Sequence, residues 1–76
     1  MKELVELIVQ AIVDEPEAVL ISEVEGSQSA IIEIRVAPGD MGKVIGKQGR
    51  IAKAIRAVTR AAASKQGRRV VVEIVE

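Results

Sequence analysis

The sequence contains no cysteine, no histidine and no aromatic residue, and each absence excludes a class of function. Without Cys, neither disulfide bonds nor a thiolate metal site can supplement the hydrophobic core. Without His, the chain lacks the commonest metal ligand and the usual general base. Without Phe, Tyr or Trp, it cannot recognise nucleic acid by stacking bases on aromatic side chains. We therefore expect no cofactor, no small-molecule substrate and no enzymatic activity.

We also expect no membrane-spanning segment and no targeting leader. No apolar run is long enough to span a membrane, and the first residues lack the basic leader of a signal peptide. These absences predict a cytoplasmic protein with no membrane partner. The 76 residues, of which 49% are apolar, suffice for one small folded domain, and we assign the range 1–76 to it.

Equal numbers of acidic and basic side chains, 11 of each, conceal a strong segregation of charge along the chain. Residues 1–40 contain nine acidic residues and two basic ones. Residues 41–72 contain no acidic residue and nine basic ones: Lys43, Lys47, Arg50, Lys53, Arg56, Arg60, Lys65, Arg68 and Arg69. A basic half of this kind is an electrostatic footprint for nucleic acid. The alternative is that the two halves neutralise each other within the fold or across a dimer.

The basic half contains a glycine turn, Gly46-Lys47-Gln48-Gly49, between two segments with helical periodicity. Glycine takes backbone angles that a Cβ resists and lets another backbone approach closely. Helix N–H groups starting near Gly49 would lack partners and would attract an anion. The turn therefore fits a phosphate-binding site or a simple helix-turn-helix corner. The pattern does not fit a nucleotide-triphosphate loop, which needs glycine at Met41 and a hydroxyl at Gln48.

Periodicity and turn signals divide the chain into three helices and three strands. Helices are expected at 2–13, 41–45 and 50–65, and strands at 18–25, 30–37 and 70–75. Asp40 is expected to cap the second helix. The run Val70-Val71-Val72 indicates a strand buried on both faces. The expected apolar stripes of the first and third helices are Leu4, Ile8, Ala11 and Ile12, and Ile51, Ile55, Val58 and Ala62.

Together these features resemble a KH domain. Residues 44–50, Val-Ile-Gly-Lys-Gln-Gly-Arg, are similar to the KH signature, and the α-β-β-α-α-β order over the full chain is similar to the type II variant. A single KH domain of this length resembles the small bacterial KhpA-like RNA-binding proteins. The resemblance implies an α+β type II KH fold, a three-stranded mixed sheet with helices on one face. Strands 30–37 and 68–75 would be parallel neighbours, with 18–25 at an edge.

The resemblance also implies a function, the non-catalytic binding of about four unpaired RNA nucleotides in a groove beside the glycine turn. The RNA-binding residues that it implies are Gly42, Lys43, Ile45, Gly46, Lys47, Gln48, Gly49, Arg50 and Lys53. Val44, Ile55 and Val58 are expected in the core. Ala52 departs from the family, which often has a bulky aliphatic residue there. The more distant basic residues Arg60, Lys65, Arg68 and Arg69 are interpreted as solvated.

Single-stranded RNA is thus the expected partner, and an RNA chaperone or post-transcriptional regulator the expected role. The alternative is a protein-interaction module that uses the KH fold as a dimerisation surface. A short groove without aromatic stacking binds weakly, so a homodimer or a second KH-containing protein is expected to supply avidity.

Overall fold

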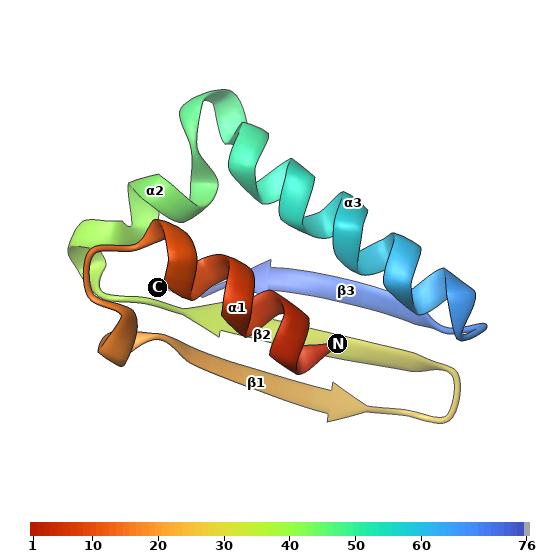
Figure 1. Cartoon of the computed structure of the whole chain (residues 1–76). Helices are drawn as coiled ribbons and strands as arrows, with labels where there is room; N and C mark the ends of the chain where they lie inside the picture. The colour runs from red at the N-terminus through yellow and green to blue at the C-terminus, as the bar shows by residue number, and fades with distance from the viewer. Residues whose placement is uncertain (76) are drawn as a thin grey trace.

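The computed structural model describes residues 1–75 and has the order α-β-β-α-α-β, which confirms the predicted class and sequence of elements (Figure 1). The helices are α1 (Lys2–Ile12), α2 (Met41–Ile45) and α3 (Arg50–Lys65). The strands are β1 (Leu20–Glu25), β2 (Ser29–Arg35) and β3 (Arg69–Ile74). Short 3-10 turns occupy Pro16–Ala18, Pro38–Asp40 and Lys47–Gly49. Within residues 1–75, no helix combines the length and the apolar character needed to cross a bilayer.

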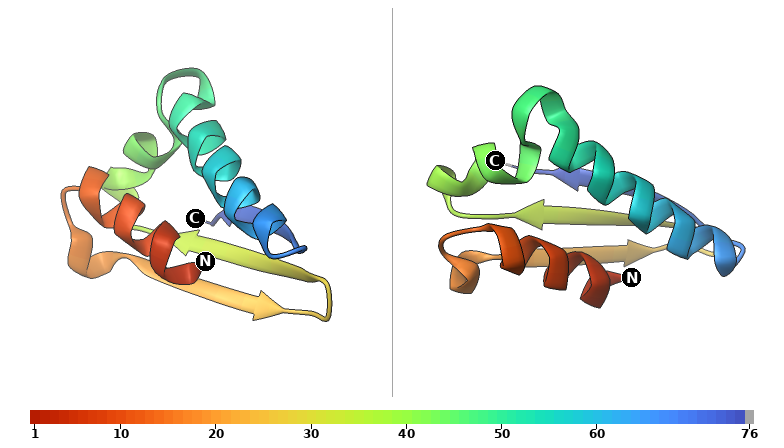
Figure 2. Two further views of the ribbon diagram at one scale, coloured as in Figure 1. Left: turned by 45° about the vertical axis from the view of Figure 1, so that its right-hand side comes forward. Right: turned by 45° about the horizontal axis from the view of Figure 1, so that its top comes forward.

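The three strands form one mixed sheet in the order β1-β2-β3. β1 pairs with β2 in antiparallel orientation, and β2 pairs with β3 in parallel orientation. All three helices lie on the same face of this sheet, which leaves the opposite face bare (Figure 2). The predicted strand pairing, the edge position of β1 and the one-sided helical layer are therefore confirmed.

The hydrophobic core lies between the sheet and the helices. The core-facing line of α1 consists of Val5 and Val9 and continues into Val13 directly after the helix, at a spacing of four residues. Of the predicted stripe of α1, Ile8 and Ile12 pack against the core from one side of this line, whereas Ala11 is exposed. Leu7 on the opposite side of the helix is 68% exposed. The apolar side chains of α1 outside this line are thus partly buried or exposed at the surface.

The buried face of α3 also differs from the predicted one. Ile55 is buried as expected, but Ile51 and Val58 are 38% and 47% exposed, so Val58 is not a core residue. The buried positions of α3 are Ala52, Ile55, Thr59 and Ala63. Thr59 can lie in the core because its hydroxyl donates to the Ile55 carbonyl at 2.7 Å. The apolar pattern missed this face because two of its four members are alanines and one is polar.

β3 is buried on one face only, which contradicts the prediction from its valine run. Val70 and Val72 are buried beneath α3, whereas Val71 is 54% exposed on the bare face of the sheet. The prediction failed because all helices within residues 1–75 pack on the other face of the sheet. Val24, Ile31 and Val71 pair side by side across the three strands and form an exposed apolar row.

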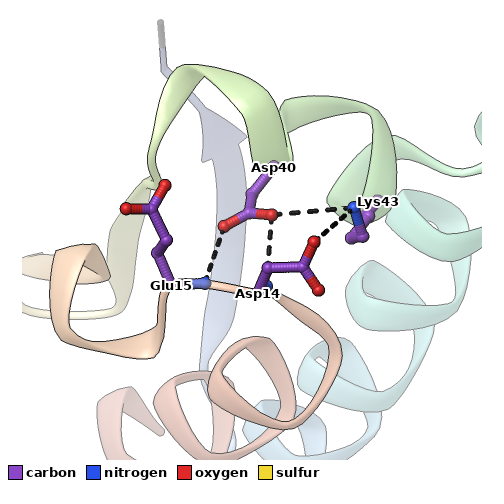
Figure 3. A network of polar contacts seen from close by, with 4 residues as sticks. All are labelled: Asp14, Glu15, Asp40 and Lys43. Atoms are coloured by element: carbon purple, nitrogen blue, oxygen red, sulfur yellow. Dashed lines mark hydrogen bonds and ion pairs between the residues drawn. The ribbon is translucent and has the colours of Figure 1, made fainter.

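Asp40 does not cap α2, contrary to the expectation. Its backbone is helical, with φ −101° and ψ −6°, and its side chain makes no capping hydrogen bond. The carboxylate instead accepts hydrogen bonds from the backbone N–H groups of Asp14 and Glu15 at 3.1 and 3.0 Å (Figure 3). Asp40 is only 2% exposed. It therefore holds the loop after α1 against the start of α2, the helix that leads into the glycine turn.

Replacing Asp40 with alanine should lower the free energy of unfolding by about 2–3 kcal/mol, because two backbone donors lose a charged acceptor. Urea unfolding at pH 7 measures this loss. Asp14→Ala is the matched control, since the Asp14 side chain is 75% exposed and its ion pair with Lys43 should contribute less than ~1 kcal/mol. Equal effects of the two substitutions would contradict the role assigned to Asp40.

Candidate nucleic-acid interface

The glycine turn joins α2 to α3 through a sequence of unusual backbone conformations. Gly46 ends α2 with φ 77° and ψ 172°, and its N–H donates to the Gly42 carbonyl at 2.8 Å. Gln48 and Gly49 follow with φ values of 58° and 74°. The Gly49 N–H donates to the Gly46 carbonyl at 3.1 Å and closes the turn. The chain thus reverses direction within four residues, and α3 starts at Arg50.

The two glycines of the turn are required for different reasons. A Cβ on Gly46 would lie 2.3 Å from Cγ1 of Ile51 and 2.9 Å from the Ile51 backbone nitrogen. A Cβ on Gly49 would meet no atom within 4 Å. Gly46 is therefore packed against the first turn of α3, whereas the surface above Gly49 is open to another molecule.

Polar groups surround this open surface. The side chains of Lys47, Gln48 and Arg50 are exposed, and an Arg50 guanidinium nitrogen lies 3.4 Å from the Gln48 side-chain oxygen. No side chain of the described residues caps the N-terminus of α3, so its first N–H groups carry the positive end of the helix dipole to the surface. Among residues 1–75, Lys47, Arg50 and Lys53 take part in no ion pair. The turn therefore presents net positive charge and free donors.

Among the described residues 1–75, Lys43 is the one predicted site cation whose charge is already matched within the fold. Its ammonium lies 3.0 Å from the Asp14 carboxylate and 3.8 Å from that of Asp40 (Figure 3). The hydrogen bond to Asp14, together with the negative charge of that carboxylate, raises the pKa of Lys43 above its ordinary value. Lys43 thus joins α2 to the loop after α1.

The other predicted site residues lie on or beside the turn. Gly46 to Arg50 form the turn and the start of α3, and Ile45, which is 40% exposed, directly precedes them. Gly42 lies one helical turn earlier, with space for a Cβ on its exposed side. Lys53 is exposed one turn into α3. Their proximity is fixed by the short α2–turn–α3 connection, and their contacts with RNA remain a prediction.

Arg56 is a further basic residue beside the site and was not among the predicted RNA-binding residues. Its Nε donates to the Val72 carbonyl of β3 at 3.2 Å. Lys53, Arg56 and Arg60 are spaced by three and four residues and therefore share one side of α3. The hydrogen bond shows that this side faces the outer edge of β3. The spacing indicated a shared face, but the sequence did not show which strand lies beside it.

Comparison with known proteins places this geometry in a family. A family model described as the KH domain of KhpA/KhpB matches residues 2–74. The RNA-binding protein KhpA of Clostridium acetobutylicum is 64% identical over 75 residues, which cover 99% of this chain and 100% of the relative. The protein of the same name from Aquifex aeolicus is 49% identical over 76 residues, 100% of this chain and 96% of the relative.

The fold is also similar to part of a larger protein of known structure. Era, crystallised in complex with MgGDPNP and nucleotides 1506–1542 of 16S ribosomal RNA, superposes with a TM-score of 0.67 at 25% identity. The match covers 96% of this chain but only 28% of the Era chain. The full-length family match, the relatives and the type II arrangement of helices and strands agree, and the chain belongs to the KhpA/KhpB family of KH domains.

Proposed function

We propose that this chain is a non-catalytic protein that binds single-stranded RNA at the glycine turn. The observation that carries the proposal is the open surface above Gly49, bordered by Lys47, Arg50 and Lys53. A sugar-phosphate backbone can approach Gly49 without meeting a side chain, and the cations and helix N–H groups supply partners for its phosphates. The names of the KhpA relatives and the RNA in the Era complex support the choice of RNA.

The positive charge of the turn favours binding of phosphate groups. Recognition of unpaired bases would favour single-stranded RNA over a duplex. In a duplex the base edges are paired, so only the phosphates would be available to the protein. No aromatic side chain is present to stack a base, which makes a weak interaction with broad base preference the expected outcome. Such a binder suits an RNA chaperone or a post-transcriptional regulator. Crosslinking in cells followed by sequencing of the bound RNA would test that role.

Affinity for a short single-stranded oligonucleotide should fall with salt, with a slope of log affinity against log salt near −2. This value assumes about three neutralised phosphates at ~0.7 each, one for each of the three cations that border the turn. Fluorescence anisotropy between 50 and 300 mM KCl would measure it, with a duplex of the same sequence as the comparison. A flat salt response, or equal binding of the duplex, would contradict the proposal.

A protein-interaction module is the second candidate function. The exposed apolar row of Val24, Ile31 and Val71 on the bare sheet face favours it, because exposed apolar side chains in a row gain by burial against a partner. A flat salt response in the experiment above would favour this function. Association of two copies, or with a second KH-containing protein, likewise stays a prediction, and sedimentation equilibrium tests the homodimer.

A further inference from the structure

The end of the domain opposite the glycine turn carries a second group of basic side chains. Arg60 from α3 and Arg69 from β3 line one surface hollow of about 330 Å³, together with Arg68, Val70 and Val71. Arg69 also borders an adjacent hollow of about 350 Å³ next to Gln28, Ser29 and Gly67. The consecutive elements α3 and β3 thus bring Arg60 and Arg69 to the same surface.

Charge at this end is only partly neutralised. Arg68 binds the Glu25 carboxylate and also donates to the Gly26 carbonyl at 3.2 Å, so its guanidinium is held in place by the β1–β2 hairpin. In the part of the chain that the structure describes, Arg60 and Arg69 enter no ion pair, and both are exposed. Arg68 therefore lines the hollow with its charge already paired, while the guanidinium groups of Arg60 and Arg69 are available to an anion.

A basic track connects this end with the glycine turn. Lys53, Arg56 and Arg60 follow one side of α3 along the outer edge of β3, where Arg56 is anchored to the Val72 carbonyl. Ten residues separate Arg50 from Arg60, which is about 15 Å of helix axis. A stacked strand covers that distance in about four to five nucleotides at ~3.4 Å each.

From this geometry we infer that Arg60 and Arg69 form a second phosphate-binding site for the same RNA strand. The inference rests on the proposed function. RNA held at the glycine turn continues along the outer edge of β3, and its phosphates reach Arg60 and Arg69 at the far end. The sequence alone favoured solvation of both residues, because nothing in it places β3 beside the basic side of α3. Strands of about four nucleotides occupy only the turn, whereas strands of about nine or more reach both sites.

The test compares oligouridines of four and ten nucleotides with the unchanged chain and with Arg60→Gln/Arg69→Gln. The double substitution should weaken binding of the ten-nucleotide strand about tenfold and leave binding of the four-nucleotide strand within about twofold. It should also reduce the salt slope for the longer strand by about 1.4, or ~0.7 for each lost phosphate contact. The longer strand offers more positions at which the protein can bind, which raises its apparent affinity. Comparing variants on the same RNA removes this effect, because it is equal for all of them.

Lys2→Gln/Arg35→Gln is the matched control, because it removes two exposed positive charges elsewhere on the domain, in α1 and on the bare sheet face. This control should leave binding of both strands within about twofold. A loss as large as that of the Arg60/Arg69 variant would show a general charge effect and overturn the inference. Equal losses of the test variant on both strands, or no loss on the longer one, would also overturn it.

Sedimentation equilibrium of the ten-nucleotide complex completes the experiment. A complex mass that corresponds to one chain of 8.1 kDa for each RNA supports binding of one strand at both sites. A mass that corresponds to two chains would attribute the effect of RNA length to self-association and overturn the inference. Failure of the proposed function gives a different result. In that case the four-nucleotide strand would not bind, or its binding would not respond to substitution of the glycine turn.

Discussion

The double substitution Lys47→Asp/Gln48→Asp should weaken binding of a short single-stranded RNA at least tenfold, a loss of about 1.4 kcal/mol or more. It replaces one positive charge by a negative one and adds a second negative charge at the open surface above Gly49. Both new carboxylates would repel a phosphate held by the helix N–H groups. Fluorescence anisotropy with a four-nucleotide oligouridine measures the loss.

The fold should tolerate this change, which makes the result interpretable. Both side chains are exposed, and Gln48 has a left-handed backbone with φ 58° and ψ 25°. Asp adopts this conformation more readily than most residues, so the substitution adds no strain there. The free energy of unfolding should therefore change by less than ~1 kcal/mol.

Lys2→Asp/Gln10→Asp provides a matched control on α1, where the same two residue types are exposed. The control changes net charge by the same amount but lies away from the glycine turn. It should reduce RNA affinity by no more than about twofold at 150 mM salt, where exposed charges farther apart than ~8 Å are largely screened. Unchanged RNA affinity of a folded Lys47/Gln48 variant would reject the turn as the binding site.

Local sequence signals predicted the element order and the position of the turn, and the KH resemblance implied the parallel pairing of β2 with β3. These features depend on periodicity, on glycine and on the KH resemblance. Burial was predicted less well, because periodicity shows which side chains share a face and not whether another element covers that face. The exposure of Ile51, Val58 and Val71 was not predicted for this reason.

Contacts between segments distant in the sequence could not be predicted from local sequence patterns. Asp40 accepts hydrogen bonds from residues 25 and 26 positions earlier, a pairing that no local pattern announces. The ion pairs of Lys43 with Asp14 and Asp40 have the same origin, and they separate this lysine from the free cations of the turn. Long-range contacts remove Lys43 from the free cations, but they add Arg56 to the residues beside the candidate site. Its hydrogen bond to the Val72 carbonyl places its side of α3 next to β3.

Gly46→Ala should have the largest effect on stability, a loss of about 2–6 kcal/mol in the free energy of unfolding. The backbone of Gly46, with φ 77° and ψ 172°, lies in a region that is essentially restricted to glycine and costs other residues about 1–3 kcal/mol. Crowding against Ile51 adds an overpacking cost of about 1–3 kcal/mol. Because a 76-residue domain has a total stability of only ~4–11 kcal/mol, this loss is a large fraction.

Gly49→Ala is the control that separates conformational strain from crowding. Its φ of 74° and ψ of 15° are left-handed, which costs alanine about 1–2 kcal/mol, but its Cβ would enter open space. Urea unfolding should therefore show Gly46→Ala to be at least ~1 kcal/mol more destabilising than Gly49→Ala. Equal losses would show that the close contact with Ile51 carries no cost.

Truncating Ile51 tests the source of the crowding directly. In a Gly46→Ala background, Ile51→Ala removes the Cγ1 atom at 2.3 Å but leaves Cβ at 2.8 Å and the backbone nitrogen at 2.9 Å. The double variant should therefore recover only part of the loss, because the backbone of α3 still opposes the new methyl group. Full recovery would place the crowding in the side chain alone. Since Gly46 supports the turn itself, reduced RNA binding by Gly46→Ala would not identify an RNA contact, whereas reduced binding by the exposed Lys47/Gln48 variant would.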